Sequence, residues 1–126
     1  MQFASPAVAV TVFKICTRQD WLAANDSGIY AGSADDARDG FIHLSTVDQL
    51  AGTLARHFVG RDDLLLIAFP AASLGDALRW GVSRGGELFP HLYAPLPISA
   101  ASGQWAVARG PSGEHVLPKL IEASGA

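Results

Sequence analysis

Residues 64–69 read LLLIAF, six consecutive apolar residues between the turn-forming GRDD and Pro70. A strand with one face in water alternates apolar and polar residues, whereas a strand covered on both faces can be apolar throughout. Six residues are also few for a helix, which usually needs ten or more. The run therefore predicts a central strand that ends at Pro70 and has other elements packed against both of its faces.

Length and composition limit the rest of the fold. The 126 residues are 49% hydrophobic and 17% charged, which suffices for one core, so we expect a single domain over 1–126. No apolar run approaches the roughly 18 residues of a membrane span, and we expect a cytoplasmic protein without membrane partners. With a net charge of −3, we do not expect a nucleic-acid partner. The sequence does not indicate an oligomeric state.

The first half of the chain predicts alternating short elements. Residues 10–16 are β-branched and apolar and predict a strand, and Thr17 with Asp20 predicts the start of a short helix that ends near NDSG. The segment GSADDARDG, residues 32–40, is rich in turn formers and predicts a loop. Thr46 and Gln49 have the spacing of a capping box, so a helix is expected from residue 47 to about 58.

The second half is richer in glycine, proline and aromatic residues. Residues 73–80 predict a short helix, residues 83–97 a mixture of loop and strand, and residues 104–109 with 115–117 a final hairpin around GPSGE. Strands and helices do not alternate in a strict βαβ period. The fold class predicted is α+β, with a curved, largely antiparallel or mixed sheet and a few short helices.

The first candidate site segment is FIHLS, residues 41–45. Strand alternation places Phe41, His43 and Ser45 on one face, next to the helix start at Thr46. These side chains and the free backbone N–H groups of a helix start could bind a ribose hydroxyl or a phosphate. In the alternative interpretation, His43 bonds a nearby carbonyl and Ser45 or Thr46 only caps the helix.

The second candidate segment is SRGGELFPHLY, residues 83–93. Glu87 follows two glycines and precedes apolar residues, so its carboxylate must be paired or functional. Its structural partner would be Arg84, Arg79 or Lys14, and its functional role would be to orient a hydroxyl or act as a base. His91 and Tyr93 share a face, where they could contact a ligand or close the core. We expect His43 and Glu87 to face one cleft.

Other signatures of chemistry are missing from the sequence. It has no G-x-S-x-G elbow, no Walker A loop and no H-E-x-x-H helix. The histidines are too scattered to predict a metal site. The single cysteine, Cys16, lies in an apolar run, which indicates a buried strand residue in preference to a catalytic thiol.

Three segments in this order, FKICTRQDW, DGFIHLST and SRGGELFPHLY, resemble the uncharacterised bacterial family called domain of unknown function 952 over nearly the whole chain. The resemblance implies a fold similar to ADP-ribosyltransferases, a split β-sheet with a cleft that binds NAD in active enzymes. The stretch beginning HLSTVDQL is also similar, more loosely, to RNA 2′-phosphotransferases of that fold. NAD is therefore the cofactor to consider, although the resemblance implies no established activity.

The resemblance also implies roles for particular residues. Lys14 or Arg18 would occupy the first-strand position, His43 and Ser45 the second, and Glu87 the third. A lysine lacks the planar bidentate contact that an arginine makes with phosphate.

Three functions remain open from the sequence. The favoured one is a nucleotide or small-ligand binding domain without turnover, with Glu87 and His43 as the candidate catalytic pair if turnover occurs. The first alternative is an active NAD-dependent ADP-ribosyl or phosphoryl transferase. The second is a structural or interaction domain whose polar residues only satisfy one another.

Overall fold

A central three-stranded antiparallel sheet organises the computed structural model, which describes residues 10–119. Its strands are β1 (Thr11–Thr17), β4 (Leu64–Pro70) and β8 (Gly103–Ala106), with β4 in the middle. β1 pairs with β4 along its whole length, from Thr11 opposite Pro70 to Thr17 opposite Leu64. The predicted strand ending at Pro70 is therefore confirmed as the centre of this sheet.

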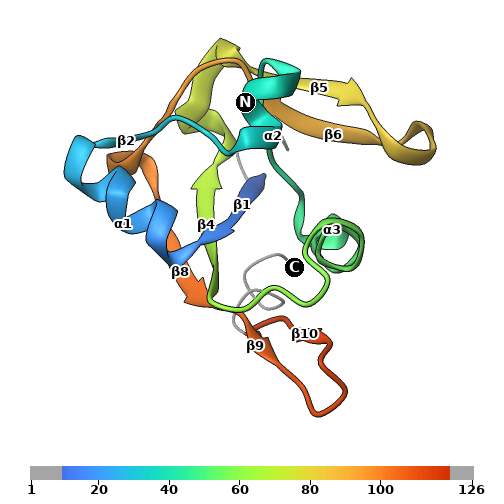
Figure 1. The fold of residues 1–126 in the computed structure, drawn as a ribbon. Helices are drawn as coiled ribbons and strands as arrows, with labels where there is room; N and C mark the ends of the chain where they lie inside the picture. Colours follow the sequence, from blue (N-terminus) through green and yellow to red (C-terminus); the bar gives the residue numbers. More distant parts are fainter. Residues whose placement is uncertain (1–9, 120–126) are drawn as a thin grey trace.

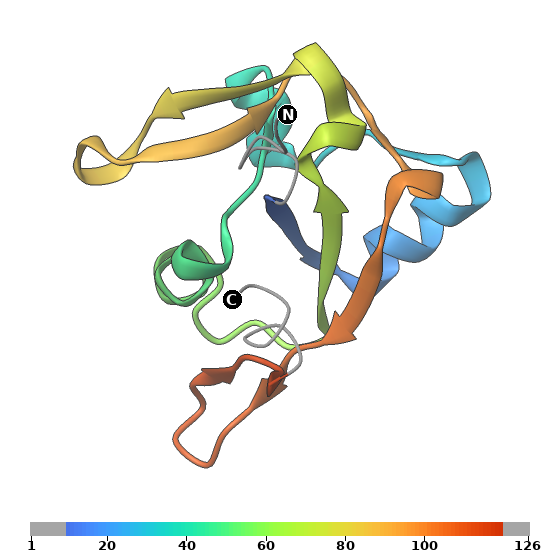
Figure 2. The ribbon, with the colours of Figure 1, turned by 180° about the vertical axis from the view of Figure 1, so that it is seen from behind.

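Both faces of the central sheet are covered, as the LLLIAF run predicts. Leu65, Ile67 and Phe69 pack into a cluster with residues of α1 (Arg18–Ser27), β2 (Ile29–Tyr30) and β7 (Leu96–Pro97). Leu64 and Leu66 pack on the other face, against α3 (Leu50–His57). Figures 1 and 2 show α1 and α3 on opposite sides of β1 and β4.

A second antiparallel sheet contains β3 (Ile42–His43), β6 (Leu88–Leu92) and β5 (Leu78–Val82), in that order. Strands β5 and β6 form a hairpin that extends away from the rest of the molecule (Figures 1 and 2). Within residues 10–119 the backbones of the two sheets are bridged at Phe13 and Ser45, which exchange two hydrogen bonds of 2.8 and 2.9 Å. Beyond this bridge, β1 and β3 diverge.

Local capping signals explain where the helices begin. Thr17 accepts a hydrogen bond from the Asp20 N–H and caps α1, which ends at Gly28, both as predicted. The capping box at Thr46 and Gln49 is also present. It opens a 3-10 turn (Val47–Gln49) that continues into α3, so the predicted helix has a 3-10 first turn.

Three predicted elements differ in the structure. The GSADDARDG segment is not a loop: it contains α2 (Ala34–Asp39), which Ser33 and Asp36 start with a second capping box. The helix expected at 73–80 is a 3-10 segment (Ala71–Ala77) followed by strand β5. The residues expected to begin the final hairpin belong instead to β8, and the hairpin itself is β9 (Ala108–Arg109) with β10 (His115–Val116).

The fold class is therefore α+β, with short helices and sheets whose strand pairs are antiparallel throughout residues 10–119. The mixed-sheet alternative is not observed there. Two further 3-10 turns, Arg84–Gly86 and Ile98–Ala100, flank β6 and β7 along the chain. No helix in the described part of the chain is long and apolar enough to cross a membrane.

Candidate functional site

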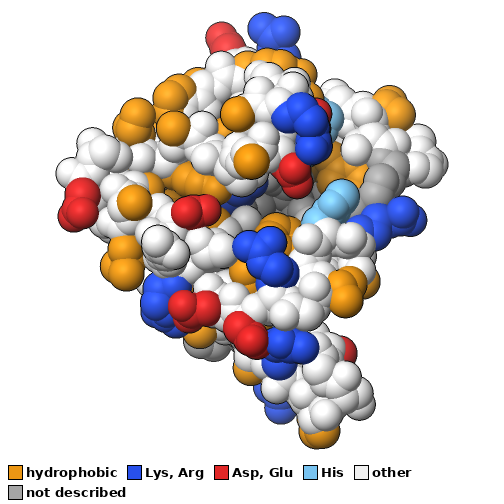
Figure 3. Space-filling view, viewed as in Figure 1, with side chains coloured by type: hydrophobic (Ala, Val, Ile, Leu, Met, Phe, Trp, Pro, Cys, Tyr) orange, Lys and Arg blue, Asp and Glu red, His pale blue; other side chains and the backbone are white. Residues whose placement is uncertain are grey.

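A cavity of about 220 Å³ lies where β1 and β3 diverge, and it is closed by α2, α3 and the β5–β6 hairpin. On the face seen in Figure 3, charged and histidine side chains gather around a hollow in the surface. The open edge of β1 contributes Lys14 and Ile15, because only Phe13 of this strand is bridged to Ser45. The bridge between the sheets thus creates the space.

A buried ion pair between Lys14 and Asp36 forms one wall of the cavity. Lys14 Nζ lies 2.9 Å from Asp36 Oδ2 and donates a further hydrogen bond of 3.1 Å to the backbone carbonyl of His43. The two side chains are only 6% and 2% exposed. Each charge compensates the burial of the other, which is the condition under which buried charges are tolerated.

Asp36 also organises the backbone around it. Its carboxylate accepts hydrogen bonds from the backbone N–H groups of Ser33, at 2.8 Å, and His43, at 3.0 Å. Burial acts to raise the pKa of Asp36, but the hydrogen bond from the His43 ring, the Lys14 charge and these two N–H groups together hold it well below its usual range. Asp36 is therefore an anion at neutral pH.

His43 is held between two carboxylates of α2. Its Nδ1 lies 2.6 Å from Asp36 Oδ1, and its Nε2 lies 2.8 Å from Asp39 Oδ2. Ionised carboxylates only accept hydrogen bonds, so a protonated ring can donate to both at once. Arg38 donates hydrogen bonds to Asp39 at 3.1 Å and to Asp35 at 2.9 Å. The hydrogen bond from Arg38 lowers the pKa of the Asp39 carboxyl.

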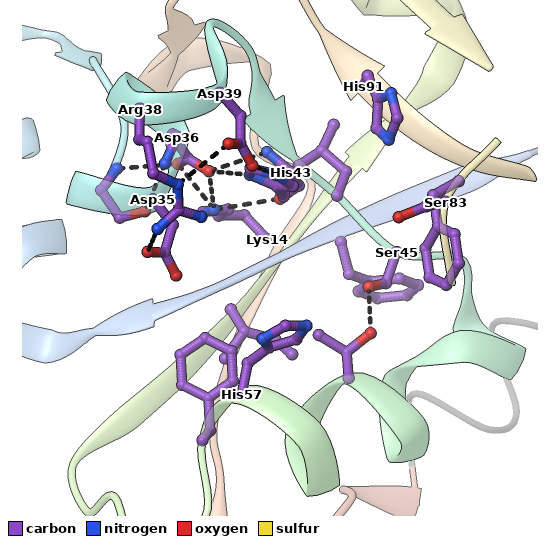
Figure 4. A pocket seen from close by; sticks show the side chains of 17 residues that line it. Lys14, Asp35, Asp36, Arg38, Asp39, His43, Ser45, His57, Ser83 and His91 are labelled. Atoms are coloured by element: carbon purple, nitrogen blue, oxygen red, sulfur yellow. Dashed lines mark hydrogen bonds and ion pairs between the residues drawn. The ribbon is translucent and has the colours of Figure 1, made fainter. Parts of the chain in front are cut away.

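His91 lies beside this charged cluster, on the neighbouring strand β6 (Figure 4). It pairs with His43 in the β3–β6 register, and the ring centroids are 6.1 Å apart. His91 is 7% exposed, and its ring stacks on Phe41 with a centroid distance of 4.0 Å. Burial, reinforced by the charge of His43, lowers the pKa of His91, so its ring is neutral at neutral pH.

The nitrogens of His91 differ from those of His43 because they have no hydrogen-bond partner among the side chains that the structure describes. In that range the fully enclosed polar side-chain atom without a partner is Tyr30 Oη, so the His91 nitrogens retain access to the cavity. Gly81 on β5 makes room for the ring: a Cβ at this position would lie 2.7 Å from His91 Nδ1. Buried polar groups are nearly always hydrogen-bonded, and exceptions often mark function.

Two hydroxyl groups line the floor between the charged cluster and α3. Ser45 Oγ lies 3.0 Å from Thr53 Oγ1, and Thr53 donates its own hydrogen to the Gln49 carbonyl. A hydroxyl has one hydrogen, so Ser45 is the donor to Thr53. Ser45 Oγ therefore offers the cavity an acceptor only.

Four of the predicted site residues meet at this cavity: Lys14, His43, Ser45 and His91. His43 and Ser45 both line the cavity, as does Leu44 between them. Lys14, and not Arg18, is the first-strand residue that reaches the site, because Arg18 forms an exposed pair with Asp63 at 3.0 Å.

The predicted cleft shared by His43 and Glu87 is wrong. Glu87 lies four residues before His91, roughly 13 Å along an extended chain, and it does not line the cavity. It is exposed, and its Oε2 accepts a hydrogen bond of 3.1 Å from Gln49. None of the partners expected for it, Lys14 among them, bonds Glu87 within the described side chains.

The remaining predicted residues lie outside the cavity lining. The Thr46 backbone N–H is already bonded to Gln49 Oε1 at 3.0 Å, so the expected anion site at this helix start is not supported. Tyr93 is 51% exposed and packs on Phe41 and Arg79. The side chain of Arg84 lies outside the described part of the chain.

Asp36 and Asp39 are the site residues that sequence reasoning missed. The available signal was S-x-x-D at Ser33 to Asp36, which is a capping box with aspartate in place of the usual glutamate or glutamine. A helix there places Asp36 and Asp39 three residues apart and therefore on one side. The abundance of turn formers in the segment concealed this pattern.

Neither a metal centre nor a reactive thiol emerges from the described residues. Across residues 10–119 no group of three or more His, Cys, Asp or Glu side chains has the arrangement of a metal site. Cys16 is buried, and burial raises the pKa of its thiol to about 12. A thiol with such a pKa is a poor nucleophile, in agreement with the structural interpretation of this residue.

The chain is similar to proteins whose function is not known. The family model described as protein of unknown function (DUF952) matches residues 15–103. The crystal structure of protein CC0527 from Caulobacter crescentus is similar, with a TM-score of 0.85 and 40% identity over 89% of this chain and 98% of that one. The solution NMR structure of CC0527 gives a TM-score of 0.76 and 41% identity, over 90% and 95% of the two chains. No curated protein matches the chain.

Proposed function

The chain belongs to the DUF952 family of proteins of unknown function, and we propose that it is a small-ligand binding domain whose ligand occupies the cavity between β1, α2, β3 and α3. The observation that carries the proposal is His91. The His91 nitrogens have no partner among the described side chains and are accessible from the cavity, where a ligand can complete their hydrogen bonds.

The rest of the cavity supports a prearranged binding site. Asp36 and Asp39 fix both nitrogens of His43, and Phe41 and Gly81 fix the ring of His91. A site whose side chains are already oriented loses little conformational entropy when its ligand binds. The cavity is also small, since pockets for drug-sized ligands usually exceed about 300 Å³.

NAD does not fit this cavity well. Its pyrophosphate would need unpaired cations or free backbone N–H groups. Lys14 and Arg38 are already paired with aspartates, and Gln49 occupies the Thr46 N–H. The relation to the ADP-ribosyltransferase fold stays a proposal, and without Glu87 in the cavity it assigns this chain no transferase step.

Thermal unfolding with and without added compounds tests the proposed function. A ligand that binds only the folded state raises the melting temperature, by an amount that grows with its concentration relative to Kd. The probes are ribose, ribose 5-phosphate, adenosine and AMP, added to the wild type and to His91→Gln. We expect at least one probe to stabilise the wild type and to lose its effect on the variant.

His115→Gln is the matched control, because His115 lies outside the cavity and bonds the Arg61 carbonyl. This variant should respond to the probes as the wild type does. Equal stabilisation of the wild type and His91→Gln, or no stabilisation by any probe, would favour the structural alternative.

A further inference from the structure

We infer that the cavity selects a neutral, hydroxyl-bearing ring compound of sugar or nucleoside size, and that a phosphate group on the same compound weakens binding. The inference rests on the proposed function and names the class of its ligand. Its basis is the charge balance of the cavity wall, together with the few polar atoms that the wall leaves available.

The charges on the wall already compensate one another. Lys14 is paired with Asp36 at 2.9 Å, and Arg38 with Asp35 at 2.9 Å. The third carboxylate, Asp39, contacts both Arg38 and the ring of His43. Each of the three carboxylates in this cluster therefore already has at least one lysine or arginine partner.

A charged ligand would have to disrupt that balance. An anion would approach three carboxylates, and it could reach the buried Lys14 only by displacing Asp36. Like charges that approach each other at a partly screened site repel. A cation could pair with one of these carboxylates only in competition with the basic side chain that the carboxylate already contacts.

The polar atoms that remain available suit hydroxyl groups. The neutral ring of His91 has one nitrogen that donates and one that accepts. Ser45 Oγ accepts only, since its hydrogen goes to Thr53. A compound that carries several O–H groups can both donate and accept, and can therefore satisfy His91 and Ser45 together.

The apolar part of the lining explains why the compound should carry a ring. Besides its polar side chains, the cavity is lined by Phe13, Ile15, Leu44, Phe58 and Phe89. Sugar rings have an apolar face of C–H groups, and nucleobases have an apolar flat face. A space of about 220 Å³ accommodates one such unit in preference to a dinucleotide.

Isothermal titration calorimetry on two matched pairs tests the inference: ribose with ribose 5-phosphate, and adenosine with AMP. The pairs distinguish a free sugar from a nucleoside. In each pair that binds, we expect the neutral compound to bind about tenfold more tightly or better, a difference of about 1.4 kcal/mol. Its Kd should be the same at low and high salt, because screening acts on charges.

Asp39→Asn provides a second readout. Loss of this carboxylate removes one negative charge beside His43 and Arg38, which keep their contacts with Asp36 and Asp35, so AMP and ribose 5-phosphate should gain affinity relative to their neutral partners. Asp26→Asn is the control, since Asp26 is an exposed residue of α1 outside the cavity, and the affinity ratio should not change.

The outcomes separate the two proposals. Tighter binding of the phosphorylated compound by the wild type, with loss of that binding in His91→Gln, would overturn the neutral-ligand inference and leave the proposed function standing. Binding of none of the four probes would remove both.

Discussion

Two buried polar residues in this cavity are satisfied to very different degrees. Asp36 accepts hydrogen bonds from two backbone N–H groups and the His43 ring, and it pairs with Lys14. His91 is only 7% exposed, yet its ring nitrogens form no hydrogen bond with any side chain that the structure describes. The bonds of Asp36 are typical of a residue that stabilises the fold. The unbonded nitrogens of His91 are typical of a residue that binds a ligand.

Substitution of Asp36 should therefore affect stability strongly. Asp36→Asn leaves the buried Lys14 ammonium without its counter-charge, and we expect a loss of about 3–5 kcal/mol in the free energy of unfolding, measured by urea denaturation. Asp62→Asn breaks the more exposed pair with Arg109 and should cost less than about 1 kcal/mol. Similar losses for the two variants would show that the Lys14–Asp36 pair is not as buried as described.

His91 should make stability depend on pH. The folded-state pKa of His91 lies below the value of 6.5 expected for the unfolded chain. Well above pH 6.5 the ring is neutral in both states, so His91 does not lower the free energy of unfolding there. As pH falls through the interval below 6.5, the unfolded chain takes up the proton first and stability is lost.

The His91→Gln variant should lose less stability than the wild type when the pH falls from neutral into this interval. Urea unfolding at a series of pH values measures the difference, and His115→Gln provides the comparison. The effect of Asp36 does not interfere, because its stabilisation starts to fall only near pH 3.8, where the carboxyl of the unfolded chain takes up its proton, and continues to fall toward the lower folded-state pKa. A wild type and His91→Gln with parallel pH profiles would show that His91 titrates as it does in the unfolded chain.

At the scale of elements, α2 shows why local sequence rules were insufficient. The segment before Gly40 is dense in aspartate and glycine, which statistically favour turns, and only the spacing of Ser33 and Asp36 indicates a helix. What stabilises this short helix is tertiary: Lys14 and His43, far away in sequence or on the next strand, bond Asp36. Contacts of this kind leave no local pattern to read.

Two glycines in different elements give opposite predictions for the same substitution. Gly52 lies in α3 and an added Cβ would meet nothing within 4 Å, so Gly52→Ala should stabilise the protein by about 0.5–1 kcal/mol. Gly81 lies in β5 against His91, so Gly81→Ala must turn the His91 ring and should cost about 1–3 kcal/mol.

Urea denaturation of both glycine variants gives the stability changes, and calorimetry with the tightest-binding probe gives the effect on the site. Gly81→Ala should also weaken binding, whereas Gly52→Ala should leave it unchanged. If Gly81→Ala is as stable as the wild type and binds normally, the position of the His91 ring does not depend on this glycine.

At the scale of the whole molecule, the sequence was most informative where burial alone sets the pattern. The LLLIAF run predicted the central strand and its two covered faces, and Thr17 and Thr46 predicted the starts of two helices. Strand order and register are set by contacts between distant segments, which a single sequence does not reveal.

This limit explains the mixed outcome for the site. The FIHLS segment contributes both His43 and Ser45 to the cavity, and these two residues could be proposed together because they are neighbours in the sequence. The pairing of Glu87 with His43 required the register of β6 against β3, and the register brings His91 to His43 instead. The correct partner was therefore in the predicted segment but four residues further along.

The central claim is that a ligand completes the hydrogen bonds of His91 inside the cavity. NMR of the imidazole nitrogens in ¹⁵N-histidine-labelled protein tests it directly, because these signals report the hydrogen bonding and protonation of each ring. On titration with adenosine and with ribose, we expect the His91 nitrogen signals to shift and saturate for the compound that binds, while those of His115 stay in place. His91 signals that remain unchanged at concentrations where calorimetry detects binding would contradict the account, because the compound would then be bound elsewhere.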